Sequence, residues 1–258
     1  MNLYNFNIVQ IVGFMLVFVR MSGLIFTMPV LGAATVPSHI KIGLAVVVSF
    51  VVFTVAKLPP VDITMPMGRF ILMLSGEVAI GLVIGFASQL MFNAVEFAGE
   101  LIGTQIGFGI VNVLDPTTNS QVSITSQFLN TVSLLIFLAI NGHHWFLTAA
   151  VKSFDVIPLL GFAPAQGLVD MIISLTADVL VLAVKLSAPV VVTLLLLNVA
   201  LGLVARTVPQ MNVFIVGFPL QIALGLFIMG ASLPTFFEIL KIYFYKFPET
   251  AVSIMRLL

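Results

Sequence analysis

Long apolar runs dominate this chain and decide what it can fold into. Six such stretches are separated by prolines and polar residues, at about 8–36, 40–58, 67–106, 123–141, 166–201 and 214–240. A helix needs about 20 apolar residues to cross the roughly 30 Å hydrocarbon core of a bilayer. The pattern therefore predicts an all-α integral membrane protein and not a soluble enzyme.

The composition supports the same class. Only 8% of the 258 residues are charged, whereas soluble domains carry about 25%. Lys plus Arg and Asp plus Glu are both 10, so the net charge is zero. Nucleic-acid binding needs a basic face, and we expect no such partner. The chain has no cysteine, which excludes disulfides and thiolate metal sites.

The first stretch is expected to be retained as a membrane segment. The residues before it lack the basic region of a secretory signal, and the apolar run is longer than a signal requires. If all six stretches cross, both termini lie on one side of the membrane. The distribution of Lys and Arg then favours the cytoplasmic side.

Two stretches are too long for a simple crossing. As single helices, 67–106 would measure about 60 Å and 166–201 about 54 Å. Each must bend or project beyond the bilayer. Pro189 offers a kink in the fifth stretch and Pro29 a kink late in the first. The second, fourth and sixth stretches fit a single crossing.

A polar stripe follows the end of the third stretch. Gln89, Asn93, Glu96 and Glu100 are spaced by four, three and four residues, which places them on one face of a helix. Carboxylates on an apolar helix are costly in lipid. The stripe is therefore expected to face water, a pore wall or a basic partner. A helix that simply emerges into solvent is the alternative.

Glycines recur on another face of the same stretch. Gly99, Gly103 and Gly107 are four residues apart, and Gly81 and Gly85 repeat the spacing upstream. Small residues at this spacing let membrane helices approach closely. The pattern predicts tight helix contacts, although it is common in membrane proteins.

An apolar segment then leaves the helix. It is hinged by glycines and ends in a polar break, and it is unfavourable both in bulk water and in lipid. The favourable environment for this segment is the interior of a protein or the lumen of a channel, where an apolar constriction excludes water. An ordinary re-entrant connection is equally compatible with the pattern. The residues of this segment are Gly107, Phe108, Gly109, Ile110, Val111, Asn112, Val113, Leu114, Asp115 and Pro116.

Charged side chains also lie within the apolar stretches, and a further arginine, Arg206, opens the last polar break. Intramembrane charges are paired or functional by default. Asp178 and Lys185 are seven residues apart, on one face but two turns from each other, so each needs a partner on another helix. We favour structural ion pairs over a proton relay. The charges are Arg20, Glu77, Asp170, Asp178 and Lys185.

Histidines and known motifs give little sign of catalysis. His143 and His144 are adjacent and point in different directions, and no third ligand is evident, so a metal site is not expected. Trp145 beside them is typical of a membrane-interface anchor. No phosphate-binding loop, nucleophile elbow or zincin motif is found, and no cofactor is expected.

Three sequence blocks carry a family resemblance over essentially the whole chain. They are GFGIVNVLDPTTNSQ at 107–121, FLAINGHH at 137–144 and ARTVPQMNVFIVGFP at 205–219. In this order the chain resembles the FliR/SpaR/YscT family of type III secretion export-gate proteins. The second block favours the flagellar branch.

The resemblance implies a single family domain built of long helical hairpins. Residues of about 1–165 would form a FliP-like part, and 166–258 a FliQ-like hairpin with a C-terminal tail. One such subunit would assemble with FliP and FliQ into a helical conduit for unfolded flagellar proteins. FlhB and FlhA would be neighbours, and membrane lipid would surround part of the assembly.

The resemblance also implies a location and a role for the apolar segment. The assembly would sit in the bacterial inner membrane within the flagellar basal body, partly raised towards the periplasm. The segment from Gly107 to about Gln121 would plug the conduit. Gln89, Asn93, Glu96, Glu100, Asp178, Lys185 and Arg206 are the candidates for interface or pore-facing positions.

Three functions are weighed. The first is a non-catalytic export-gate subunit that helps form and close the conduit. The second is an ion-coupled carrier of a small solute, using Glu77, Asp170, Asp178 and Lys185. The third is an intramembrane enzyme, for which no nucleophile and base set is recognisable.

Overall fold

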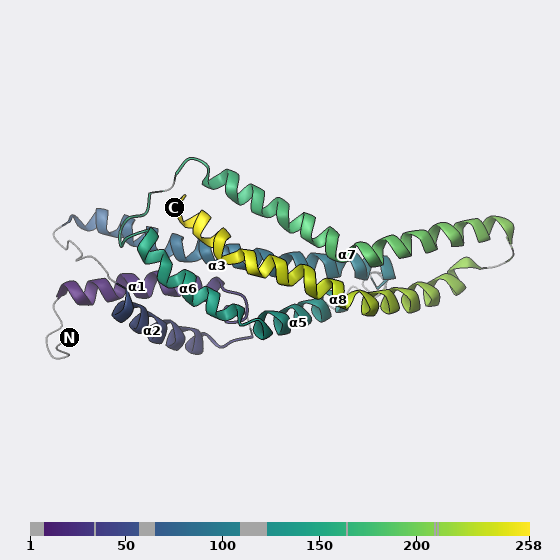
Figure 1. Cartoon of the computed structure of the whole chain (residues 1–258), viewed down its shortest axis with the longest axis horizontal. Helices are drawn as coiled ribbons and strands as arrows, with labels where there is room; N and C mark the ends of the chain where they lie inside the picture. The colour runs from purple at the N-terminus through teal and green to yellow at the C-terminus, as the bar shows by residue number, and fades with distance from the viewer. Residues whose placement is uncertain are drawn as a thin grey trace. The chain divides into compact units, whose positions relative to one another are not determined.

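The computed structural model describes residues 8–33, 35–56, 65–108, 123–163, 165–208, 210 and 212–258. Every regular element in these ranges is an α-helix, which confirms the predicted class (Figure 1). The helices are α1 (Ile8–Thr27), α2 (Ser38–Val55), α3 (Met67–Ile106), α5 (Ile124–Ala139), α6 (Gly142–Val156), α7 (Leu168–Thr207) and α8 (Val213–Met255).

The described helices agree with a membrane protein. Five of them are long and apolar enough to cross a bilayer, or six spans if α5 and α6 together count as one. The third stretch is one 40-residue helix with the predicted bounds. The fifth, predicted at 166–201, is a single 40-residue helix that continues through Pro189 and ends later than predicted, at Thr207. Figure 1 shows α7 bent partway along its length.

The predictions for the first and fourth stretches were wrong. The first stretch does not kink at Pro29, because α1 already ends at Thr27. Proline has no N–H and disfavours helical geometry in the residue before it. The fourth stretch is not a simple crossing, since α5 has only 16 residues and Asn141 has a left-handed φ of 56° before α6 begins.

The sixth stretch was also predicted too short. α8 has 43 residues and ends at Met255 instead of 240. Hydropathy falls beyond 240 because Lys241, Lys246 and Glu249 enter the sequence. The buried face nevertheless continues through Phe244, Phe247 and other apolar residues.

The chain folds into two compact units that are discontinuous in sequence. The first comprises Met1–Leu90, Asn141–Leu175 and Tyr245–Leu258, and the second comprises Met91–Ile140 and Thr176–Phe244. The predicted division near residue 165 into FliP-like and FliQ-like parts stays a prediction.

The first unit contains close contacts between α1 and α3. A Cβ on Gly81 would overlap the carbonyl oxygen of Arg20, and one on Gly85 would overlap the Thr27 hydroxyl. Leu16, Met21 and other apolar residues are fully buried in this unit. The upstream glycine pair therefore forms the tight helix contact that its spacing predicted.

An aromatic cluster forms the core of the second unit. Phe92, Phe137 and Phe244 come from α3, α5 and α8. Their ring centroids lie 5.4–5.6 Å apart in all three pairs. Such geometry stabilises a core beyond the effect of burial alone.

The glycine contact gives a first prediction. Gly81→Ala places a methyl group against the backbone of α1, so the helices must move apart, at a cost of about 1–3 kcal/mol. Gly43 in α2 has nothing within 4 Å of an added Cβ. Gly43→Ala is therefore a matched control that is neutral or slightly stabilising.

Thermal unfolding of the two detergent-solubilised variants checks this prediction. We expect a lower Tm for Gly81→Ala and an unchanged or higher Tm for Gly43→Ala. Equal Tm values for both variants would contradict the close α1–α3 approach.

Candidate functional site

The apolar segment predicted to be a plug begins within the described structure. Gly107 and Phe108 follow the last residue of α3. The other positions of the predicted plug lie outside the described residues, and their role stays a prediction. These positions are Gly109, Ile110, Val111, Asn112, Val113, Leu114, Asp115 and Pro116.

The start of this loop has a defined backbone geometry. Gly107 has a φ of 100°, which glycine adopts without strain. The Phe108 N–H donates to the Gly103 carbonyl at 3.0 Å, and the Gly107 N–H donates to Thr104 at 3.2 Å. These are the two bonds of a Schellman motif, which satisfies the last carbonyls of a helix. α3 therefore ends at a fixed point and turns the chain sharply.

The chain returns from the loop onto the same helix. The Thr125 hydroxyl donates to the Gly99 carbonyl at 2.7 Å, and the Ser126 hydroxyl donates to the Glu96 carbonyl at 2.9 Å. The Ser123 and Thr125 hydroxyls are 2.5 Å apart. The first turn of α5 is thereby fastened to α3.

The glycine face of α3 makes this contact possible. A Cβ on Gly99 would overlap the backbone of Ser126, and one on Gly103 would overlap the Ser123 hydroxyl. The described structure therefore stops after Phe108 and resumes at Ser123, at neighbouring points on α3. We call this arrangement of Gly99, Gly103, Gly107, Ser123 and Thr125 the loop base. This arrangement is suited to fixing the position of the two points that flank the loop.

The polar stripe lies on the same helix. Gln89, in the first unit, is exposed. In the second unit Asn93 is exposed, and Glu96 and Glu100 are half-buried. Neither glutamate makes an ion pair with another residue that the structure describes. Both carboxylates remain available for water or a basic group of a partner.

The charges of α7 have different surroundings. Asp178 and Lys185 are exposed and not paired with each other. The Lys185 ammonium lies 3.5 Å from the Tyr243 hydroxyl and 6.0 Å from its ring. Asp170 is exposed in the first turn of α7 and Arg206 in the last, where each complements the helix dipole.

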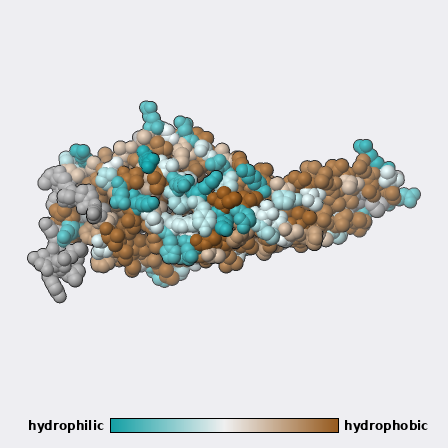
Figure 2. All heavy atoms as spheres, in the orientation of Figure 1, coloured by the Kyte–Doolittle hydropathy of each residue, from teal (hydrophilic) through white to brown (hydrophobic). Residues whose placement is uncertain are grey.

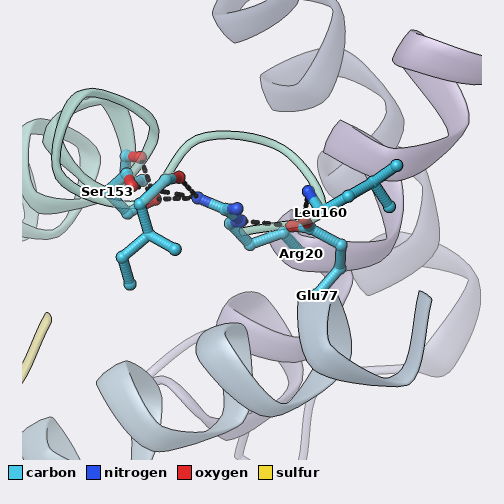
Figure 3. A network of polar contacts seen from close by, with 6 residues as sticks. Arg20, Glu77, Ser153 and Leu160 are labelled. Atoms are coloured by element: carbon cyan, nitrogen blue, oxygen red, sulfur yellow. Dashed lines mark hydrogen bonds and ion pairs between the residues drawn. The ribbon is translucent and has the colours of Figure 1, made fainter. Parts of the chain in front are cut away.

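Arg20 and Glu77 form a fully buried ion pair in the first unit. The Arg20 Nε and Glu77 Oε2 atoms are 2.5 Å apart, and both side chains have an exposed fraction of 0% (Figure 3). This confirms the predicted structural pairing for these two charges. Charged groups at this depth are stable only when they are paired and hydrogen-bonded.

The same pair holds the end of α6 and the loop after it. Arg20 Nη1 donates to the carbonyls of Ser153 and Ile157, each at 3.0 Å. Glu77 Oε1 accepts the Leu160 N–H at 2.7 Å (Figure 3). The Arg20 guanidinium also lies 4.2 Å from the centre of the Phe154 ring. Arg20 thus satisfies carbonyls at a helix C-terminus, while Glu77 fixes the following turn.

The histidine pair does not form a metal site with other residues in the described ranges. The rings of His143 and His144 lie with their centroids 4.2 Å apart and their planes tilted by 39°. No cluster of three or more possible ligands is found in that part of the chain. Trp145 packs on Tyr245, with centroids 5.0 Å apart.

Apolar side chains remain exposed over much of the second unit. In the most apolar 18-residue segment of α8, only 11% of the residues are buried within this chain. The corresponding share in α7 is 33%. Figure 2 shows hydrophobic surface over the connected ends of these two helices. Asn198 and Gln221 interrupt it and hydrogen-bond to each other. A surface of this kind requires lipid or another protein chain to cover it.

Several residues that anchor the loop or bind Arg20 were not identified from the sequence. The loop is anchored by the hydroxyl groups of Ser123, Thr125 and Ser126. The Arg20 guanidinium donates hydrogen bonds to the carbonyls of Ser153 and Ile157. The hydroxyl cluster directly after the loop was a usable signal for the anchor. The carbonyls that Arg20 binds carry no sequence signal, because every residue has one.

Comparison with known proteins gives a consistent result. The family model for bacterial export proteins, family 1, matches residues 11–247. The flagellar biosynthetic protein FliR of Bacillus subtilis is 35% identical, over 95% of each chain. Its namesake in Escherichia coli is 33% identical over 83% of this chain and 82% of its own length. That of Aquifex aeolicus is 32% identical over 87% and 86%.

The buried ion pair gives a second prediction. Glu77→Gln keeps an acceptor for Leu160 but leaves the buried Arg20 charge without a counter-ion, which costs about 3–5 kcal/mol. Glu96→Gln removes a half-buried carboxylate with no ion pair in the described structure and should change stability by less than about 0.5 kcal/mol. Membrane protein level and Tm in detergent distinguish the two. Equal values for the two variants would contradict a structural role for the pair.

Proposed function

The chain belongs to the bacterial export proteins, family 1, and from this membership we propose that it is a non-catalytic subunit of the flagellar type III protein export apparatus. The relationship to flagellar biosynthetic proteins covers almost the full length of both chains. That coverage is the observation that carries the assignment, since a fold class alone would not define a function.

The proposed partners are FliP and FliQ, with FlhB and FlhA as neighbours. One copy of the chain would join them in a hetero-oligomeric gate for unfolded flagellar proteins. The exposed apolar sides of α7 and α8 support this arrangement, because they leave a large surface to be covered. Asp178, Glu96 and Glu100 make no ion pair in the described residues and would meet polar groups of neighbouring subunits.

The proposed location is the bacterial inner membrane within the flagellar basal body, with part of the gate raised towards the periplasm. Long helices support it, because α3 and α7, with 40 residues each, measure about 60 Å and exceed the hydrocarbon thickness. The excess length would pack against protein outside the bilayer.

The loop after α3 is the proposed closing element of the gate. The loop base holds the described residues on either side of 109–122 to one helix. Closing the ends together in advance lowers the entropy cost of holding the loop across a lumen. Its apolar residues would exclude water from the closed conduit, and an entering substrate would displace them.

The ion-coupled carrier is not retained. Glu77, one of its proposed relay residues, is held in a buried ion pair with Arg20. Asp170 is exposed in the first turn of α7, where an acidic side chain commonly stabilises a helix by complementing its dipole.

Export in living cells tests the assignment. Removing the gene from the bacterium that encodes it should abolish secretion of flagellar proteins and swimming, and a plasmid copy should restore both. Secretion is measured by immunoblot of the culture medium, with a cytoplasmic protein as lysis control. Normal flagella in the deletion strain would refute the assignment.

The loop gives a separate prediction. Deleting residues 109–114 keeps the Schellman turn and the α5 anchor but removes the apolar filling. We expect the gate to assemble and to leak small ions, measured as loss of membrane potential in cells that express it. A matched control replaces the polar residues 117–120 with Gly and Ser at unchanged length and should not leak.

Assembly is checked by copurification in both loop variants. A gate that assembles with residues 109–114 deleted and still keeps the membrane potential would contradict the closing role.

A further inference from the structure

The outer face of α2 differs from the exposed apolar surface of α7. α2 has 18 residues, and its buried side consists of Lys41, Ala45, Ser49 and Val52, spaced by four, four and three. The opposite side carries β-branched and aromatic residues that remain open, with Val47 61% and Phe50 50% exposed. We call this side, formed by Gly43, Val46, Val47, Phe50, Val51 and Thr54, the α2 outer face.

The charge of α2 is turned away from this face. The Lys41 ammonium donates to the Gly32 carbonyl at 2.8 Å and lies 5.8 Å from the centre of the Phe26 ring. The Lys41 side chain is therefore buried on the α1 side, although an exposed lysine would be cheaper in water. Thr54, the one polar side chain on the α2 outer face, donates to its own helix at Val51, at 2.7 Å. The face offers no free polar group to a partner.

The distribution of small and bulky residues also separates the two sides of α2. Ala45 and Ser49 lie on the side that packs against α1, and the Phe14 and Phe53 rings meet edge to face, with centroids 5.9 Å apart. Close protein contacts elsewhere in the chain use glycine, as at Gly81 and Gly99. Helices in membranes associate through small residues. The α2 outer face is instead bulky, and its single glycine, Gly43, has nothing near it.

The dimensions of α2 match a bilayer. Its 18 residues span about 27 Å, against roughly 30 Å for the hydrocarbon core. Ser38 and His39, both exposed, mark its polar N-terminal end. By contrast, the open surface of α7 is interrupted by Asp178, Lys185 and Asn198, which suit protein or water and are costly against acyl chains.

From these observations we propose that the α2 outer face contacts lipid acyl chains in the finished assembly and is not covered by another subunit. The occupant is lipid because the face matches the bilayer in length, its one hydroxyl is bonded within α2, and bulky residues cover it apart from Gly43. α2 thereby sets the depth of the first unit in the membrane. This inference rests on the proposed multi-subunit assembly, which the secretion experiment tests separately.

Single-cysteine labelling tests the proposal without background from this chain, because its sequence has no cysteine. Nitroxide labels are placed on the outer side at Ile40→Cys, Val47→Cys and Thr54→Cys, and on the inner side at Ala45→Cys. The labelled chain is purified with its partners in native-lipid nanodiscs. Collision of each label with oxygen, which concentrates in lipid, is compared with collision with a water-soluble nickel chelate. Swimming of each unlabelled variant shows that it still folds.

The proposal predicts a mobile label at position 47 with strong oxygen collision and almost no nickel collision. The preference for oxygen should fall towards positions 40 and 54, because these lie nearer to the two surfaces of the bilayer. The label at 45 should be immobile and reach neither probe.

Two results would overturn the proposal. An immobile label at 47 that meets neither probe would mean that a protein subunit covers the face. Strong nickel collision at 47 would mean that the face borders water. Either result leaves the export assignment intact if the variant still swims.

Discussion

The Arg20–Glu77 ion pair joins segments that are far apart in sequence, and the arrangement of the first unit depends on it. It links α1 to α3, and through Ser153, Ile157 and Leu160 it fixes the end of α6 and the following turn. Both side chains are completely buried. Such a pair adds little net stability compared with well-packed apolar residues, but removing one partner is severe. The pair therefore contributes mainly to the specificity of helix packing. Helices of nearly uniform apolar character can slide along one another, whereas a buried charge pair with directed hydrogen bonds is satisfied in only one register.

The exposed apolar surface falls into two chemical kinds. The α2 outer face is unbroken, bulky and of bilayer length. The open sides of α7 and α8 are longer and carry Asp178, Lys185 and the hydrogen-bonded pair Asn198 and Gln221. Lipid can satisfy the first kind but not the second. A subunit with both kinds is suited to a membrane-embedded assembly in which part of its surface meets acyl chains and part meets protein.

The sequence predicted the class of fold and the long third helix, because apolar periodicity and the absence of prolines carry that information directly. It also predicted that Arg20 and Glu77 would be structurally paired, although it could not identify them as partners across 57 positions. The predictions for the end of α8 and for the helix around Asn141 were wrong, because tertiary packing decided the first and a left-handed residue the second.

At the candidate site, spacing identified the glycine face of α3 and the start of the loop. The hydroxyl anchor on α5 was missed because its acceptors are main-chain carbonyls, which leave no sequence pattern.

We propose that other protein chains cover much of the apolar surface of this chain and hold the loop base where it would close a conduit. The most direct test is the mass of the particle that copurifies with the tagged chain, expressed at natural level and extracted in native lipid. A discrete hetero-oligomer, several times heavier than the 27.8 kDa chain, is the predicted result. A stable, monodisperse particle that contains a single 27.8 kDa chain and lipid alone would contradict the account.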